Sequence, residues 1–172
     1  MEFELKPLSK AAIDGALERA TTYRLLNEPR AAESICRDAM VADPENQQAI
    51  IELILSLTDQ FPTGKGGLVS EAESLSSKLD SEYHQAYYRG LVFERRAAAQ
   101  LDKRTPGCGD VVYDWLRDAM HFYETAQKLQ ADANDNDESV LRWNFCARII
   151  MAHPEICPAD DEKGSHDVHM FD

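Results

Sequence analysis

The chain has 172 residues, of which 31 are acidic and 18 basic, giving a formal net charge of −13 with a hydrophobic content of 44%. This length predicts about one domain, and the hydrophobic content is enough to build a core. The acidic balance argues against nucleic-acid binding and against docking on an anionic membrane, because both need clustered cations. No apolar run approaches the ~20 residues of a membrane helix, and residues 1–10 hold no apolar signal core, so we expect a cytoplasmic protein.

Helical periodicity dominates the chain, and no β-type alternation of any length interrupts it. Seven helices are predicted, over residues 11–26, 30–42, 47–60, 68–79, 83–101, 111–131 and 138–152. Ser9 is expected as the N-cap of the first helix, and Ser70 with Glu73 has the spacing of a capping box in the fourth. Glycine and proline mark loops at 61–67 and 103–109. The sequence therefore predicts an all-α fold in which antiparallel neighbours are joined by turns.

Composition divides the chain into three segments. Residues 1–10 are predicted to form an N-terminal arm, and residues 11–153 a helical repeat domain. Pro154 and Pro158 end the last helix, because proline cannot continue it. Residues 154–172 are expected to be an acidic and disordered tail, since the sequence becomes aperiodic and rich in Asp and Glu.

A fixed spacing of small and large residues recurs along the helices. In the first two helices the set is Ala16, Arg19, Ala20, Tyr23, Ala32, Cys36, Ala39 and Pro44. The alanines allow two helices to approach closely, and Tyr23 and Cys36 are expected to fill the gap between them. The spacing recurs 34 residues later and twice more, at Ile50, Leu53, Ile54 and Leu57, at Ala86, Arg89, Gly90 and Phe93, and at Trp143, Cys146, Ala147 and Ile150.

This pattern resembles a tetratricopeptide repeat, in which large, small and aromatic residues alternate at these positions and a proline closes the repeat. The period of 34 residues is that of the family. Second-helix matches are Ala72 and Leu79 in the second repeat, and Ala119, Tyr123 and Ala126 in the third. The gap from Gly90 to Ala119 is 29 residues instead of the 12 from Ala20 to Ala32, so either the helices are longer or the loop bulges out. The resemblance covers about three repeats and a lone capping helix.

The resemblance implies a right-handed superhelix whose first helices line a concave groove that binds a protein or peptide, without catalysis or a cofactor. The residues expected to line this groove are Thr21, Arg24, Leu55, Tyr87, Leu91, Glu94, Asn144 and Arg148, together with Thr58 and Arg95. This lining is apolar and aromatic in the middle with cations at the edges. We therefore expect an extended or helical partner segment with a hydrophobic anchor and an acidic group. An alternative is that these residues are ordinary solvated positions, or that an end helix fills the groove.

Three alternative functions stay open. Cys157, His166 and His169 could hold a transition metal, although no CxxC or HExxH pattern supports such a site. Bacterial secretion chaperones are similarly acidic and have about three such repeats by resemblance. Self-association is a third alternative, in which an exposed end helix completes the stack of a second copy.

Other features are ambiguous by themselves. The run from Gly64 to Gly67 resembles a phosphate-binding loop only in composition, because it follows a helix and lacks the GK[ST] ending. Arg95–Arg96 and Lys103–Arg104 form a basic patch that could meet an acidic partner. Of the four cysteines, Cys36 and Cys146 are expected to be buried, whereas Cys108 lies in a Pro-Gly-Cys-Gly turn and is expected to be exposed.

Overall fold

The structure is a computed structural model that describes residues 3–103, 105–129 and 137–159. Its helices are α1 (Ile13–Leu25), α2 (Pro29–Ala42), α3 (Gln47–Thr58), α4 (Leu68–Ser76), α5 (Glu82–Asp102), α6 (Gly109–Leu129) and α7 (Glu138–Ala152), with 3-10 turns η1 (Lys10–Ala12) and η2 (Phe61–Thr63). These described residues contain no strand, so the prediction of an all-α fold with seven helices is confirmed. Within them, no helix combines the length and the apolar character that membrane crossing requires.

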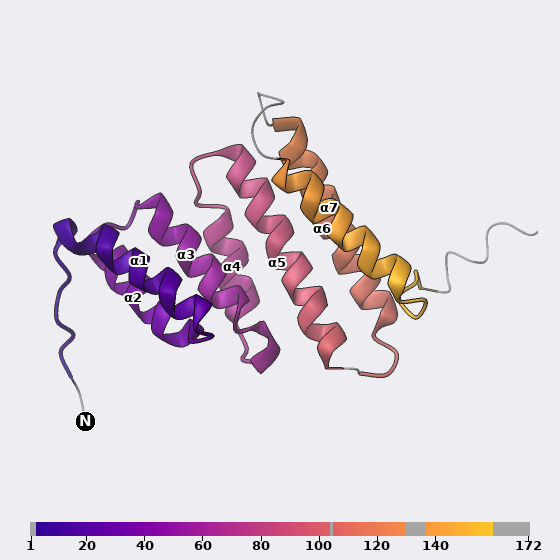
Figure 1. Cartoon of the computed structure of the whole chain (residues 1–172), viewed down its shortest axis with the longest axis horizontal. Coiled ribbons are helices and arrows are strands. Elements are labelled where there is room, and N and C mark those ends of the chain that lie inside the picture. The colour runs from indigo at the N-terminus through magenta and orange to yellow at the C-terminus, as the bar shows by residue number, and fades with distance from the viewer. Residues whose placement is uncertain (1–2, 104, 130–136, 160–172) are drawn as a thin grey trace, which may run out of the picture.

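The helices lie side by side in chain order along the long axis of the molecule (Figure 1). Each helix packs mainly against its neighbours in the chain, and the most extensive packing joins α5 to α6. Some contacts also skip a helix, and the most extensive of these join α1 to α3 and α3 to α5. The odd-numbered helices α1, α3 and α5 therefore form a row of their own.

Side-chain hydrogen bonds cap the N-terminal ends of α3 and α5. Asn46 caps α3 by accepting a 2.9 Å hydrogen bond from the Ala49 amide, and Ser81 caps α5 by accepting from the amide of His84. Two predicted caps are wrong. Ser9 makes no side-chain cap bond, and α1 starts only after η1. The capping box of α4 is absent because its N-cap is Gly67, to whose carbonyl the Ser70 hydroxyl donates.

The wide spacing between Gly90 and Ala119 in the third predicted repeat is explained by the length of its two helices. Helices α5 and α6 have 21 residues each, so the extra residues between Gly90 and Ala119 lie mostly in the helices. Helix α4 ends at Ser76, three residues before its predicted end. The end predicted for α6 at residue 131 lies outside the described residues.

Small residues permit close helix packing where the spacing predicted it. Ala20 in α1 and Ala32 and Ala39 in α2 are completely buried, as is Cys36 between them. Tyr23 is 37% exposed, so it lies at the margin of this contact and does not fill it. The core is formed by two clusters. One lies between α1 to α4 and one face of α5, which contributes Val92 and Ala99, and the other lies between α5, α6 and α7.

Gly90 marks the closest approach of α5 and α6. A Cβ atom added to Gly90 would lie 2.9 Å from Cε1 of Tyr123 and 3.2 Å from the carbonyl oxygen of Ala119. A side chain at this position would therefore prevent the Tyr123 ring from packing flat on α5.

The segment after α7 returns to the body of the protein. Ile156 is buried in the second core cluster, although it belongs to the stretch predicted as a tail. Its neighbour Glu155 presses its carbonyl oxygen against Gly109, where any Cβ would overlap it. The packed part of the chain therefore extends at least to Ile156, and residues 160–172 lie outside the described residues.

Candidate functional site

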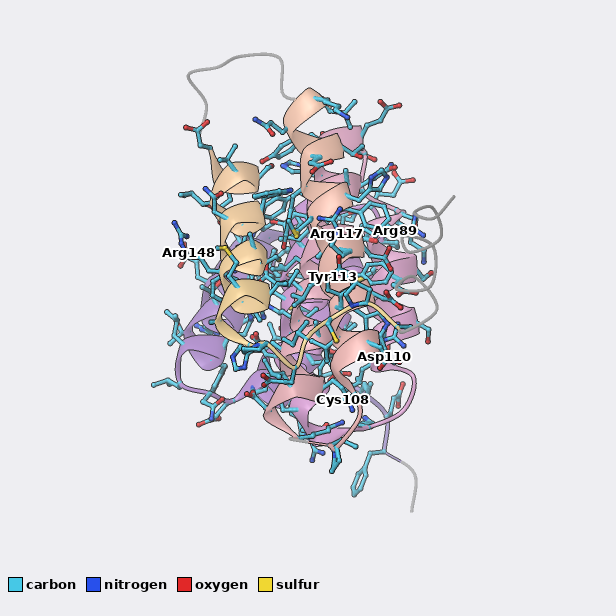
Figure 2. All side chains as sticks on the ribbon, turned by 90° about the vertical axis from the view of Figure 1, so that its right-hand side faces the viewer. Arg89, Cys108, Asp110, Tyr113, Arg117 and Arg148 are labelled. Atoms are coloured by element: carbon cyan, nitrogen blue, oxygen red, sulfur yellow. The ribbon has the colours of Figure 1, made fainter. Side chains whose placement is uncertain are left out.

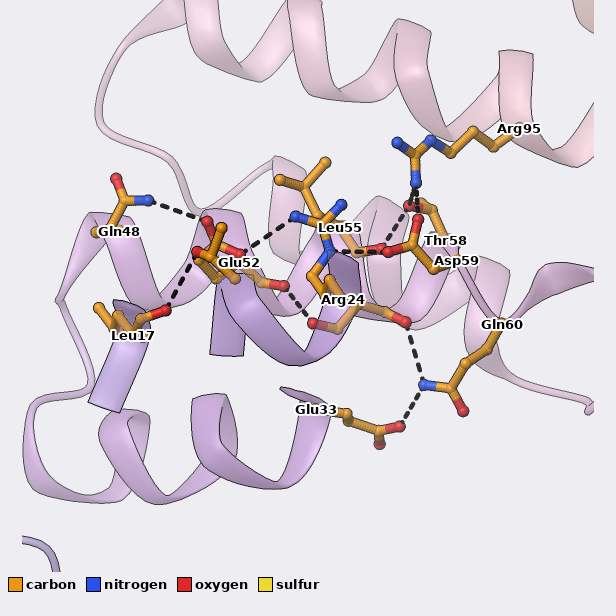
Figure 3. Close-up of polar contacts among 12 residues, drawn as sticks. Leu17, Arg24, Glu33, Gln48, Glu52, Leu55, Thr58, Asp59, Gln60 and Arg95 are labelled. Carbon is orange, nitrogen blue, oxygen red and sulfur yellow. Dashed lines mark hydrogen bonds and ion pairs between the residues drawn. The ribbon is translucent and has the colours of Figure 1, made fainter. Parts of the chain in front are cut away.

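A cluster of two arginines and two carboxylates joins the helices α1, α3 and α5 (Figure 3). Arg24 donates from Nε to Asp59 at 2.8 Å and from Nη1 to Glu52 at 3.3 Å. Arg95 donates to the same Asp59 and, at 3.0 Å, to the hydroxyl of Thr58. The four charges cancel, and the side chains fix the spacing of the row of helices.

The positions of these residues in their helices explain the cluster. Glu52 and Asp59 are seven residues apart, so they lie two turns apart on one face of α3. Asp59 is the C-cap of α3, where the helix dipole disfavours a negative charge, and the two arginines offset this cost. Arg24 is in the last turn of α1, where the dipole favours a cation.

A hollow of about 290 Å³ opens beside this cluster, between the ends of α1 and α3. Thr21, Arg24, Leu25, Asn27 and Asp59 line it. Leu25 is 83% exposed, and Leu55 on the adjacent α3 is half-buried. The predicted groove positions Thr21, Arg24 and Leu55 therefore lie at a partly accessible surface. Thr58 of α3 is only 2% exposed, so the expectation that it lines an open groove is corrected.

Three of the four predicted groove positions of α5 are inside the protein, and the fourth, Arg95, is half-buried. Leu91 is 1% exposed and Glu94 3% exposed, and Tyr87 is also buried. The Tyr87 hydroxyl donates to Glu138 of α7 at 3.0 Å. The expectation that these three side chains are open to a partner is corrected, because all three are buried, and Tyr87 and Glu94 form hydrogen bonds to α6 and α7.

Glu94 is the centre of this second polar cluster. Its carboxylate accepts a 2.7 Å hydrogen bond from the Tyr123 hydroxyl and a 3.1 Å bond from Arg142, with the Cys146 thiol at 3.9 Å. Burial raises the pKa of Glu94, although the bonds from Tyr123 and Arg142 oppose the rise. Burial also raises the pKa of Tyr123 far above the phenol value, so its hydroxyl remains a donor. This cluster attaches α7 to α5 and α6.

The predicted groove residues of α7 lie apart from those of the other helices. Asn144 is half-buried, and Arg148 is exposed on the outer side of the helix (Figure 2). Three large apolar side chains of α7 are also exposed, Leu141, Phe145 and Met151. The ten predicted groove residues thus fall into three groups. Thr21, Arg24, Leu55 and Arg95 are partly accessible, Thr58, Tyr87, Leu91 and Glu94 are buried, and Asn144 and Arg148 lie on α7.

A larger hollow of about 890 Å³ lies between the loop before α6 and the segment after α7. Cys108, at the end of α6 seen in Figure 2, lines it together with His153 and Glu155. The His153 ring nitrogen Nδ1 lies 3.0 Å from a carboxylate oxygen of Glu155. Sequence neighbours gave no sign that a histidine shares a cavity with Cys108, because the two residues meet only through the returning chain.

Within the described residues, no group of three or more His, Cys, Asp or Glu could hold a metal ion. Cys157 is half-buried. His166 and His169 lie outside the described residues.

The four thiols are expected to differ sharply in reactivity. Burial raises the pKa of Cys36 to about 11 and that of Cys146 to about 12, so at pH 8 about one thiol in a thousand or fewer would be ionised. We therefore expect iodoacetamide to modify the partly exposed Cys108 and Cys157 in the folded protein, and Cys36 and Cys146 only after unfolding. Peptide mass spectrometry measures this, and rapid labelling of Cys36 at pH 8 would contradict the packing of α1 on α2.

Comparison of the chain with known protein families, with curated proteins and with solved structures gave no match. The functional proposal below therefore depends on the residues and geometry of this chain.

Proposed function

We propose that the chain is a non-catalytic protein–protein interaction scaffold with a tetratricopeptide-like arrangement. In this arrangement α1/α2, α3/α4 and α5/α6 are the helix pairs of a right-handed superhelix, and α7 is the capping helix. The packing order supports the proposal, because successive first helices also contact each other, from α1 to α3 and from α3 to α5. Completely buried small residues, such as Ala20 and Ala119, support it as well.

The binding surface that we propose is the exposed end of the odd-numbered row, at the hollow beside Arg24. This one observation carries the proposal, since the hollow combines the exposed Leu25 with the side chains of Thr21 and Asn27. An apolar anchor of a partner would pack on Leu25, and its polar groups would bond with the hydroxyl and the amide. Because Glu52 and Asp59 balance Arg24 and Arg95, the partner needs no acidic group here.

A charge placed in the hollow tests this function. We expect Leu25→Glu to remove most of a stoichiometric partner from affinity purifications of the full chain, because it places a carboxylate where an apolar anchor packs. Val41→Glu is the matched control, since Val41 on α2 is 82% exposed and lies outside the hollow. Quantitative mass spectrometry of the co-purified proteins gives the ratio between the two variants.

Both substitutions are at exposed positions, so the helical content measured by circular dichroism should stay unchanged. Equal recovery of the partner with both variants would contradict the proposed surface. Failure to recover any stoichiometric partner with the wild-type chain would contradict the scaffold function itself.

A further inference from the structure

A cavity of about 180 Å³ lies between the loop after η2, the end of α5 and the first turns of α6. Lys65 from the loop and Arg96 and Lys103 from the end of α5 line it, together with Trp115 from α6. No acidic residue is among its lining residues in the described part of the chain. The glycine-rich loop and the basic patch, two separate features of the sequence, thus share one site.

The three cations line the cavity without forming an ion pair among the described residues, although the charge of Lys65 also lowers the pKa of the nearby Glu33. The guanidinium carbon of Arg96 lies 3.9 Å from the centre of the Trp115 ring, which fixes the plane of the group and leaves its N–H edges available. The Lys103 ammonium nitrogen lies 3.5 Å from where a Cβ of Gly64 would be, so it lies against the loop. Among the described residues, none of Lys65, Arg96 and Lys103 forms an ion pair.

The convergence of three cations on one cavity distinguishes this site, since other described cations such as Arg89 and Arg117 form no ion pair either. Arg24, Arg37, Arg95 and Arg142 are each paired with at least one carboxylate. By contrast, three like charges around one small cavity repel each other, and the repulsion is relieved when an anion enters. The cavity is thus electrostatically prepared for a negative ligand although the whole chain carries a net charge of −13.

The size of the cavity limits the ligand. At about 30 Å³ per water molecule it holds roughly six waters, which is enough for a tetrahedral oxyanion. It is smaller than the ~300–1,000 Å³ of pockets that enclose drug-sized ligands. Val69, in the first turn of α4, also lines it, and the Gly67 N-cap of this helix offers its first amides no side-chain acceptor. The positive end of the α4 dipole therefore lies on the same side as the cations.

We propose that this cavity binds a phosphoryl group, either as inorganic phosphate or as the end of a small phosphomonoester. This mode of phosphate recognition differs from that of a phosphate-binding loop between a strand and a helix. Here the loop runs from η2 to α4, and side-chain cations supply most of the hydrogen-bond donors. The site does not depend on the proposed peptide-binding surface, which lies at the α1–α3 hollow.

Titration of the full chain with inorganic phosphate at constant ionic strength tests the site. We expect saturable shifts of the Trp115 indole and Gly64 amide signals in ¹H–¹⁵N spectra, with a Kd of about 1 mM or lower. A parallel titration with phenyl phosphate identifies the source of the group. Tighter binding of the ester assigns a phosphomonoester whose organic part contacts Phe61 and Trp115, whereas tighter binding of the free ion assigns inorganic phosphate.

Two variants and one control decide the result. Arg96→Gln and Lys103→Gln should each weaken phosphate binding at least about tenfold, because each removes a charge-assisted donor. Lys103 is exposed, so its variant keeps the test valid even if Arg96→Gln disturbs the packing on Trp115. Lys78→Gln, at an exposed lysine outside the cavity, should bind as the wild type does.

The proposal would be overturned by the absence of saturable shifts. It would also be overturned if sodium chloride or sodium acetate produced the same shifts at the same concentrations, because the cavity would then have no selectivity for a phosphoryl group. If Lys78→Gln weakened phosphate binding as much as the two cavity variants, the binding would depend only on the overall charge of the protein and not on this cavity.

Discussion

Replacing Glu94 with alanine is expected to lower the free energy of unfolding by about 3 kcal/mol. The carboxylate is 3% exposed and accepts hydrogen bonds from Tyr123 and Arg142. Without it, the completely buried Tyr123 hydroxyl has no acceptor, and this orphaned donor carries most of the cost. Arg142 contributes less, since its side chain is 32% exposed and keeps Glu138 at 3.6 Å.

Urea denaturation followed by circular dichroism measures the loss. Glu94→Gln should cost about 1 kcal/mol, because the amide oxygen can still accept from Tyr123. Glu18→Ala is the surface control on α1 and should change the stability by no more than about 0.5 kcal/mol. Hydrogen exchange should locate the effect of Glu94→Ala in α7, because the cluster attaches this helix to α5 and α6. A loss below about 1 kcal/mol would mean that the cluster contributes no more than a solvated ion pair.

Gly15 in α1 and Gly90 in α5 are expected to respond to alanine with opposite signs. Gly15→Ala should stabilise the protein by up to about 1 kcal/mol, since no atom lies within 4 Å of the new methyl group in α1. Gly90→Ala gains the same helix propensity but forces a methyl group to 2.9 Å from the Tyr123 ring. The ring cannot move away freely, because it is completely buried and its hydroxyl is bonded to Glu94.

Overpacking of this kind costs about 1–3 kcal/mol, so we expect the two variants to differ by about 2 kcal/mol or more in their free energies of unfolding. Thermal and urea denaturation of both variants beside the wild type measure the difference. Gly90→Ala being as stabilising as Gly15→Ala would show that α5 and α6 are not in the close contact described.

The buried glutamate and the buried glycine belong to one arrangement. Tyr123 packs its ring on Gly90 and donates its hydroxyl to Glu94, one turn further along α5. The pattern of the third repeat placed a small residue at Gly90 and an aromatic residue at Tyr123, but the contact between them appears only in the structure. The pattern did not predict the second contact either, because nothing in the local spacing distinguishes a buried glutamate from a solvated one.

The predicted groove residues also divide into positions that the sequence pattern placed correctly and positions that it did not. Thr21, Arg24 and Leu55 are at a surface as expected, whereas Leu91 and Glu94 are inside. All of these positions were predicted from the same repeat pattern, applied to each helix separately. The difference arises because α7 contacts α5 through Glu138, Arg142 and Cys146, and the path of α7 is not encoded in the sequence of α5.

The sequence by itself determined the helices, their order and most of their ends, because apolar periodicity, glycine, proline and capping residues act within a few residues of each other. It also placed the small residues at which helices approach. Only the tertiary structure decided which charges are paired and which converge unpaired, as Lys65, Arg96 and Lys103 do. The physical reason is that the pairing of charges depends on the angles and distances at which whole helices cross. These depend on many contacts between residues far apart in the chain, so the sequence around each charge does not indicate its partner.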